Sequence, residues 1–368
     1  MSIEPIVVPK WGMAMDEGTL TGWLVENGAA VSAGQEIAEV ETTKIANAIE
    51  ASASGILYQA ADVGSIVPVG GLLAVIAVGG ASAEEANAYI AANRSDAPAR
   101  KAEAEKIDPT RTVDVDGLSI RYLEAGEGGT PVVFVHGFGA DLNTWMFNQG
   151  TIAAHQRTIS LDLPGHGASS KSVGDGDVPA LARVVGRFLE TIGVARAHFV
   201  GHSLGGAVCL QLALDKPNLV ASLTLVAPAG IGENLSDAFL QGFIGETRAR
   251  KLEPVLAMLV ANPELVTAQM VEDVLRAKRL DGALDALRTI AGNAFPQGRQ
   301  AARFDTRLGE LSAPVSIVVG ADDQIIPASQ AAALSNVVPV RLEAGVGHLA
   351  HMERPEVVNA AILQVAGI

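Results

Sequence analysis

The hydrophobic residues of the first 80 positions form short runs that are broken by glycine and proline, and this pattern occurs twice. At a constant offset of 36 positions, Gly28, Val31, Gly34, Ile37 and Val40 recur as Gly64, Val67, Gly70, Leu73 and Ile76. Short apolar runs between turn-forming residues predict strands and turns. Two similar halves of this length predict a small all-β sandwich with quasi-twofold symmetry over residues 1–80.

Residues 81–111 are rich in alanine and in charged side chains. Ten of the 26 residues in 81–106 are alanine, and the helix-like stretch 84–93 comes before Pro98. Such a composition predicts a linker that is partly helical. An ordinary surface helix is the alternative interpretation.

From residue 112 onward, short apolar runs alternate with longer segments, and two of these, 179–192 and 204–215, have helical spacing. The predicted strands are Val132–Val135, Thr158–Leu161, His198–Val200, Leu223–Val226, Val315–Val319 and Val340–Leu342. This alternation predicts a second domain over residues 112–368, an α/β fold with a parallel sheet and helices on both faces. Residues 231–309 interrupt the alternation with charged, helix-like segments, and we expect them to form a helical cap over the site.

The composition narrows the functional classes. The 368-residue chain has a formal net charge of −15 and a pI near 4.9. Nucleic acids and anionic membranes are bound by basic surfaces, so neither is expected as a partner. The single cysteine, Cys209, excludes an internal disulfide framework and is expected in the core. The sequence has no secretory signal and no apolar run of about 18 residues, so a cytoplasmic protein is expected.

Lys44 is one of only two basic residues in 1–80, against nine carboxylates. It lies in the polar stretch 41–44 between two strand-like runs, which predicts the tip of a hairpin. A lone amine at such a tip is sterically open, as an enzyme that attaches a prosthetic arm requires. The repeat pairs Lys44 with Gly80, so the lysine and the end of the domain should lie at opposite ends of the sandwich. A solvated hairpin lysine is the alternative.

Residues 3–79 resemble a lipoyl domain, the swinging-arm module of 2-oxo acid dehydrogenase complexes, which has a small all-β fold called a barrel-sandwich hybrid. The resemblance rests on the E-T-x-K sequence at 41–44, on Gly34 ten residues before the lysine and on Gly55 eleven residues after it. It implies lipoate covalently bound at Lys44. Biotin carrier domains share the fold but usually place methionine on both sides of the lysine, and this chain has none there.

A candidate nucleophile follows the predicted strand His198–Val200. The residues from Gly201 to Gly205 read G-H-S-L-G, which fits the G-x-S-x-G pattern of a tight strand-to-helix turn. Small residues on either side of Ser203 allow the turn, and the following helix directs its N-terminus at the hydroxyl. A serine hydroxyl needs a base and an orienting carboxylate to act as a nucleophile at neutral pH.

His348 is the expected base, because it lies in a glycine-containing loop after the last predicted strand. The histidines that compete for this role are His136, His155, His166, His198, His202 and His351. Of these, His351 is the nearest alternative, and we expect it in the helix that begins near Pro355. Asp323 is the expected acid, since it follows strand Val315–Val319, and Asp322 is its alternative.

An oxyanion hole needs two backbone donors. One should be the amide of Leu204, directly after the nucleophile, and the other should come from the segment 136–139, which follows strand Val132–Val135. His136 is expected to brace this segment, and residues 162–169 are interpreted as a shaping turn without chemistry of their own.

Residues 112–368 resemble the α/β-hydrolase family, because four motifs occur in its order, with the acid fitting G-x-x-D-x-x-x-P. The family resemblance implies the triad Ser203, Asp323 and His348, with the Phe138 amide as the second oxyanion donor and no metal at the site.

The fusion of the two modules resembles the dihydrolipoamide acetyltransferase (E2) family of acetoin dehydrogenase complexes. This resemblance implies transfer of acetyl from lipoyl-Lys44 to coenzyme A, with a thiamine-diphosphate-dependent E1 and a dihydrolipoamide dehydrogenase E3 as partners. The H-x-x-x-D-G motif of the usual E2 domain is not found in the sequence, nor is a subunit-binding module. How E1 and E3 dock, and whether the chain is a homo-oligomer, are therefore left open.

Two other functions stay open from the sequence. The chain could be a hydrolase of an ester, thioester or C–C bond that is tethered to a lipoyl carrier. Alternatively, the hydrolase-like domain could be a scaffold and the lipoyl domain the only working part. A set of basic residues in the cap could hold the phosphates of coenzyme A, although solvated helix faces are the favoured interpretation. These residues are Arg248, Arg250, Lys251, Arg276, Lys278 and Arg279.

Overall fold

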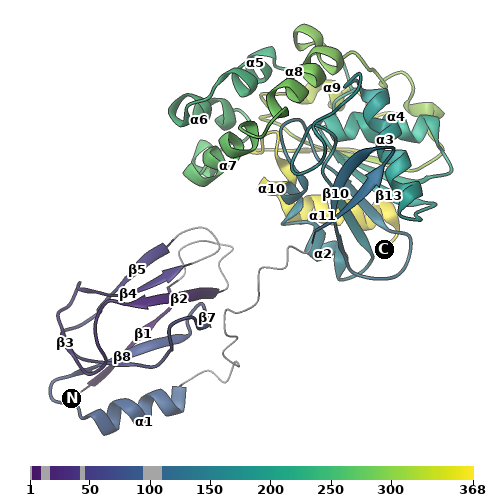
Figure 1. Cartoon of the computed structure of the whole chain (residues 1–368). Helices are drawn as coiled ribbons and strands as arrows, with labels where there is room; N and C mark the ends of the chain where they lie inside the picture. Colours follow the sequence, from purple (N-terminus) through teal and green to yellow (C-terminus); the bar gives the residue numbers. More distant parts are fainter. Residues whose placement is uncertain (1, 10–16, 42–45, 94–109) are drawn as a thin grey trace. The chain divides into compact units, whose positions relative to one another are not determined.

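The computed structural model describes residues 2–9, 17–41, 46–93 and 110–368 and divides the chain into two compact units, Met1–Ile107 and Asp108–Ile368 (Figure 1). Each unit is described by itself. The predicted domain boundaries at residues 80 and 111 stay predictions.

The first unit is a sandwich of two four-stranded antiparallel sheets, with strand orders β1-β8-β6-β3 and β5-β4-β2-β7. The strands are β1 (Ser2–Val7), β2 (Glu17–Trp23), β3 (Ala30–Val31), β4 (Glu36–Glu41), β5 (Ala46–Glu50), β6 (Gly55–Gln59), β7 (Ile66–Pro68) and β8 (Leu72–Val78). Apolar side chains from both sheets, among them Leu20, Ile37 and Leu73, fill the space between them.

The sequence repeat of the first unit is present in its backbone. Gly28 and Gly64 have φ of 85° and 88°, and Gly34 and Gly70 have φ of 81° and 80°. Residues other than glycine rarely adopt this left-handed backbone conformation. Each pair of glycines therefore forms the same turn in each half. The predicted quasi-twofold pattern is confirmed at these turns.

The helix predicted within the linker is α1 (Ala83–Asn93), which packs against β8. A capping box begins it: the Ser82 amide donates to Glu85 Oε2 at 2.7 Å, and the Glu85 amide donates to Ser82 Oγ at 3.2 Å. Ala86 is fully buried. The remainder of the predicted linker lies almost wholly outside the described residues.

The second unit contains an eight-stranded sheet with the order β16-β15-β14-β13-β11-β12-β10-β9. Its strands are β9 (Arg111–Val115), β10 (Leu118–Ala125), β11 (Val132–Val135), β12 (Thr158–Leu161), β13 (Ala197–His202), β14 (Val220–Val226), β15 (Val315–Gly320) and β16 (Val340–Glu343). The six strands from β11 to β16 are parallel, as predicted. No strand was predicted between residue 110 and Val132, whereas β9 and β10 lie there and extend the sheet as an antiparallel pair.

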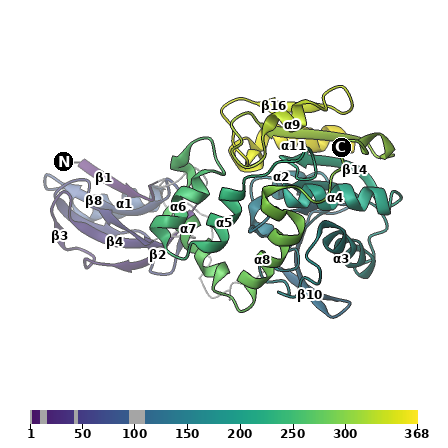
Figure 2. The same cartoon turned by 90° about the horizontal axis from the view of Figure 1, so that it is seen from above.

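Helices cover both faces of this sheet, as predicted (Figures 1 and 2). On one face lie α3 and α4, and on the other lie α2 and α11. These helices, with the shorter ones beside them, are η1 (Leu142–Trp145), α2 (Gln149–Ala153), α3 (Val178–Thr191), α4 (Leu204–Asp215), α9 (Ala328–Ala332), α10 (Ala350–Glu353) and α11 (Pro355–Ala366). Along β11, successive residues alternate between the two cores, which explains its uninterrupted apolar sequence.

The interruption predicted at residues 231–309 is a group of helices at one end of the sheet (Figure 2). Its elements are α5 (Asp237–Gly245), α6 (Ala249–Ala257), η2 (Pro263–Leu265), α7 (Ala268–Lys278), α8 (Ala283–Ala294), η3 (Pro296–Gly298) and, near its end, η4 (Leu308–Glu310). We call α5 to α8 the cap. Within the described ranges, no helix combines the length and apolar character needed to cross a membrane.

Candidate active site

Lys44, the predicted lipoate attachment residue, lies outside the described residues. The strands on either side of it are described: β4 and β5 pair antiparallel, and Glu41 is opposite Ala46 at the end of the ladder. The short segment 42–45 therefore connects two paired strands, as the hairpin prediction requires.

Ser203 occupies a strained turn between β13 and α4. Its φ of 50° and ψ of −117° lie outside the regions that non-glycine residues usually adopt, at a cost of about 1–3 kcal/mol. The turn is held by its backbone: the Ser203 amide donates to Val226, and the Ser203 carbonyl accepts from Gly206 and Ala229. A turn so fixed presents one side chain at the end of the sheet, as predicted for a nucleophile.

The glycines beside Ser203 allow this turn through close contact. A Cβ atom at Gly201 would lie 2.6 Å from the Gly205 carbonyl oxygen, and one at Gly205 would lie 2.2 Å from the Val135 carbonyl oxygen. Both distances are far below van der Waals contact. The prediction that the motif needs small residues on both sides of the serine is confirmed.

Asp323 and His348 form a buried pair. Nδ1 of His348 lies 2.8 Å from Oδ2 of Asp323, and their side chains are 3% and 1% exposed, respectively. The other carboxylate oxygen of Asp323 accepts from the amides of Ile325 at 2.7 Å and Ile326 at 3.0 Å. A carboxylate so placed keeps the proton of His348 on Nδ1, which leaves Nε2 as the acceptor that a general base needs.

The alternative residues are placed elsewhere. Asp322 is exposed. His351 is buried and its Nε2 lies 2.8 Å from Thr144 Oγ1. Contrary to the sequence expectation, His351 is not in the helix that begins at Pro355. It lies in the separate short helix α10, because the backbone of Arg354 is not helical and separates the two helices. Cys209 is fully buried, as expected.

His202 connects the nucleophile turn to the candidate base. Its Nε2 donates to the backbone carbonyl of His348 at 3.1 Å, and the two rings are 4.7 Å apart between centroids. The structure shows no hydrogen bond between the Ser203 hydroxyl and His348. Such bonds are often long without substrate and shorten in the complex, so the catalytic roles stay a prediction. From the sequence, His202 was only one of the histidines that compete for the role of base, and its bond to His348 was not foreseen.

The candidate oxyanion loop, residues 136–139, lies against the same turn. A Cβ atom at Gly137 would be 3.1 Å from Cβ of Ser203. The Phe138 amide donates to no backbone carbonyl of the described chain. The Leu204 amide is at the first position of α4, where amides have no acceptor within the helix. Two amides without acceptors beside one hydroxyl support the predicted oxyanion hole.

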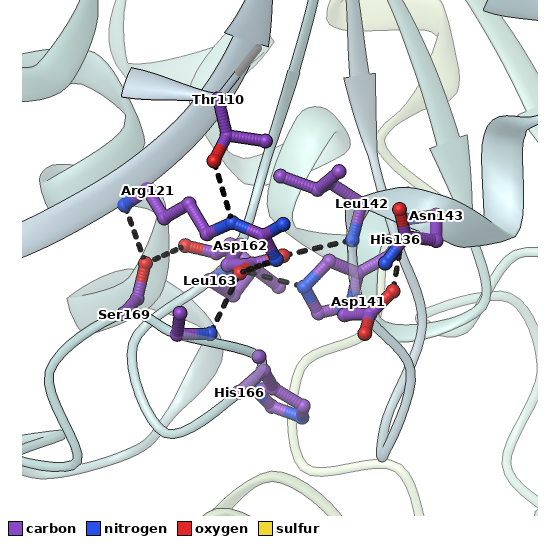
Figure 3. Close-up of polar contacts among 12 residues, drawn as sticks. Thr110, Arg121, His136, Asp141, Leu142, Asn143, Asp162, Leu163, His166 and Ser169 are labelled. Carbon is purple, nitrogen blue, oxygen red and sulfur yellow. Dashed lines mark hydrogen bonds and ion pairs between the residues drawn. The ribbon is translucent and has the colours of Figure 1, made fainter. Parts of the chain in front are cut away.

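A buried network braces this loop from behind (Figure 3). His136 Nδ1 donates to the Gly137 carbonyl at 2.8 Å, and its Nε2 accepts from the Leu163 amide at 3.0 Å. Asp162, fully buried, accepts from the Leu142 amide at 2.8 Å and lies 3.4 Å from the Arg121 guanidinium. The prediction that His136 braces the loop is confirmed. The contacts of the buried Asp162 are the physical cause of the shape of the turn that follows it.

Burial keeps four histidines around this site uncharged. It lowers the pKa of His166 and of His351 to about 3, with repulsion from neighbouring histidines adding to the effect. Burial also lowers the pKa of His136 and, to well below its usual value, that of His202. These side chains can therefore act as neutral hydrogen-bonding groups near neutral pH.

We expect the free energy of unfolding of the second unit to fall as the pH drops below about 6.5. The unfolded chain binds protons there that the folded chain does not, so stability is present above pH 6.5 and is lost toward pH 3. Each such histidine contributes a slope approaching about 1.4 kcal/mol per pH unit. Urea unfolding at pH 8, 6 and 5 measures this dependence of the free energy of unfolding on pH.

His351→Gln should reduce this slope, whereas His155→Gln, at an exposed position, should leave it unchanged. Equal slopes in all three proteins would show that His351 titrates alike in the folded and unfolded chains.

Five of the six basic residues predicted to lie on solvated cap helices are exposed, and the sixth, Lys278, is buried. Arg276 is exposed and lies 3.4 Å from Asp273. Lys278 contradicts both sequence interpretations, because it is buried and bonded to backbone carbonyls instead of lying in solvent or being free for a phosphate. Among the described residues, no cluster of three or more histidine, cysteine or acidic side chains could hold a metal ion.

Two family models match the chain. Residues 4–76 match the model described as biotin-requiring enzyme, and residues 130–355 match the model of the α/β hydrolase fold. The second match covers more than half of the chain. The chain is therefore an α/β-hydrolase-fold protein with a biotin- or lipoyl-type domain at its N-terminal end.

Relatives that match the whole chain narrow this class. The chain is 40% identical to the dihydrolipoyllysine-residue acetyltransferase component of the acetoin cleaving system from Cupriavidus necator, over 100% of this chain and 98% of the relative. It is 42% identical to the component of the same name from Pseudomonas putida, over 98% of each. The chain belongs to this acetyltransferase family, an acyltransferase family, and the resemblance seen in the sequence is confirmed.

The solved structures support the fold. A meta-cleavage product hydrolase from Pseudomonas fluorescens is 19% identical and superimposes with a TM-score of 0.64, over 70% of this chain and 97% of that chain. At this identity the likeness shows the α/β-hydrolase fold alone.

Proposed function

We propose that the chain transfers an acetyl group from an arm on Lys44 to coenzyme A, with Ser203, His348 and Asp323 as the catalytic residues. The observation that carries this proposal is the buried pair of His348 Nδ1 and Asp323 Oδ2 at 2.8 Å, joined through His202 to the strained turn at Ser203. A base with its proton fixed on Nδ1 beside an activated serine is the arrangement for acyl transfer.

Lipoate on Lys44 would supply a dithiol arm that carries the acetyl group as a thioester. The residues that the structure describes fit such a group, because β4 and β5 pair up to Glu41 and Ala46 and leave only a short connection that contains Lys44.

The chain's own residues would then perform the transfer in two steps. Ser203 Oγ attacks the acetyl carbonyl carbon while His348 Nε2 accepts the hydroxyl proton. The amides of Phe138 and Leu204 hold the carbonyl oxygen as it becomes negative. The imidazolium returns its proton to the departing sulfur, which leaves acetyl on Ser203. In the second step, His348 accepts the thiol proton of coenzyme A, the thiolate sulfur attacks, and Ser203 regains its proton.

We also infer that the partners are a thiamine-diphosphate-dependent E1 and a dihydrolipoamide dehydrogenase E3. The support is the name of the full-length relatives, which are components of an acetoin cleaving system.

The test follows acetyl transfer from the full chain, with lipoylation of Lys44 verified by intact mass. We expect acetyl-coenzyme A to form only when coenzyme A is present, and Lys44→Arg to abolish transfer because no arm can be attached. The same variant should keep labelling of Ser203 by a fluorophosphonate, since the second unit is unchanged.

Two outcomes would contradict the proposal. Release of acetate at the same rate with and without coenzyme A would identify a hydrolase, in which water takes the acyl group. Transfer that persists in Lys44→Arg would show that the acetyl donor does not depend on this lysine.

A further inference from the structure

Lys278 is buried in an unusual place for a lysine. Its side chain lies at the end of α7 and the residue is 6% exposed, and no other lysine or arginine in the described ranges is buried to this extent. An ammonium group removed from water is costly unless it is hydrogen-bonded. The partners of Lys278 therefore indicate what it holds in place.

Those partners lie at the end of another cap helix. Nζ of Lys278 donates to the backbone carbonyl of Phe243, in the last turn of α5, and to that of Glu246, the residue directly after the helix. The carbonyls of a last helical turn receive no hydrogen bond from the amides of their own helix, and they carry the negative end of its dipole. A cation from α7 thus satisfies the free end of α5. Nζ also lies 5.5 Å from the centroid of the Phe243 ring.

Phe243 in turn rests on the candidate oxyanion loop. Its ring centroid is 5.8 Å from that of Phe138, with an angle of 62° between the planes. Gly139 has a φ of 74°, and a Cβ atom there would lie 2.4 Å from the Phe243 ring. The ring is therefore pressed against the loop's backbone on the residue after Phe138. Because Phe243 is 3% exposed and also packs on Phe239, it has little freedom to move away.

We propose that Lys278 is a positioning residue for acyl transfer: it fixes the last turn of α5, so that Phe243 holds the loop that carries the Phe138 amide. The cap then does more than cover the site, because the placement of one oxyanion donor depends on a contact between two cap helices. This proposal rests on the proposed function of Ser203.

The test compares Lys278→Met, Lys278→Arg and Arg276→Met in the full lipoylated chain. Activity is the Ser203-dependent hydrolysis of p-nitrophenyl acetate and the transfer of acetyl to coenzyme A, both divided by the number of serines that react with a fluorophosphonate. We expect Lys278→Met to lower kcat per reactive serine about tenfold with KM little changed, because a misplaced donor weakens the transition state more than substrate binding. Lys278→Arg keeps a donor and should recover most of the loss.

Arg276→Met is the matched control, since Arg276 is on the same helix and its side chain is 72% exposed. A second variant, Phe243→Leu, keeps an apolar side chain and both carbonyls but removes the ring. If Lys278 acts through Phe243, the double variant should lose no more than the worse single variant. A loss of kcat in the double variant equal to the product of the two single losses would overturn the proposal.

A merely structural role predicts a different result. Lys278→Met would then have fewer reactive serines and a lower melting temperature, but wild-type kcat for each serine that remains, and this outcome also overturns the proposal. The proposed function fails separately, if Ser203→Ala leaves the rate of acetyl transfer to coenzyme A per protein molecule unchanged.

Discussion

Ser203→Ala should lower the rate of acetyl transfer by about 10⁴-fold or more while Lys44 stays lipoylated. The substitution removes the only atom that could accept the acetyl group in the proposed first step, and it leaves the oxyanion donors in place. Stability should change little, because the Ser203 hydroxyl makes no hydrogen bond to the described residues and alanine, like serine, carries a Cβ atom in this strained turn. Single-turnover transfer to coenzyme A measures the effect.

The control for this experiment is Ser335→Ala, at an exposed serine. Both variants must carry the same lipoate mass. Full transfer by Ser203→Ala would support the scaffold function, in which the lipoyl domain alone works. A ternary transfer with no acetyl on Ser203 after rapid quenching would contradict the covalent step.

Asp323→Asn should lower kcat by about 10⁴-fold, for a reason that the structure makes specific. The amides of Ile325 and Ile326 donate to one oxygen of Asp323. An asparagine would keep its carbonyl oxygen on these amides and turn its NH₂ group toward His348. That NH₂ can only donate, so His348 would carry its proton on Nε2 and could not accept the proton of Ser203.

Asp322→Asn is the matched control, because Asp322 is the exposed neighbour that the sequence left as the alternative acid. It should keep wild-type kcat. The tautomer itself can be measured by the ¹⁵N chemical shifts of His348, which should change in Asp323→Asn only. An equal loss in both variants would instead point to a general effect of charge at this loop.

The candidate triad could be read from the sequence because each member follows a predicted strand. Ser203, Asp323 and His348 come after β13, β15 and β16, and the carboxyl ends of parallel strands meet at one edge of the sheet. The strands were readable because strands buried on both faces are apolar without interruption. Asp322 and Asp323 could not be separated by spacing alone, since the distinction depends on which side chain points inward.

The contacts that support the triad could not be read in the same way. His202 bonds to His348 across 146 positions, and Lys278 is buried only because α5 and α7 pack in the cap. A lysine on a charged helix has the same sequence pattern whether its tip lies in solvent or under another helix. The strands β9 and β10 were missed because they are partly exposed and less uniformly apolar.

The three candidate catalytic residues differ in how well the sheet supports them. Ser203 follows β13, which is paired on both sides, whereas His348 follows β16, a four-residue strand at the border of the sheet whose Leu342 is 52% exposed. Fraying of that border costs far less free energy than global unfolding. A molecule with its last strand locally open would keep its nucleophile and its fold but lose its base, so heat inactivation would begin before the melting transition.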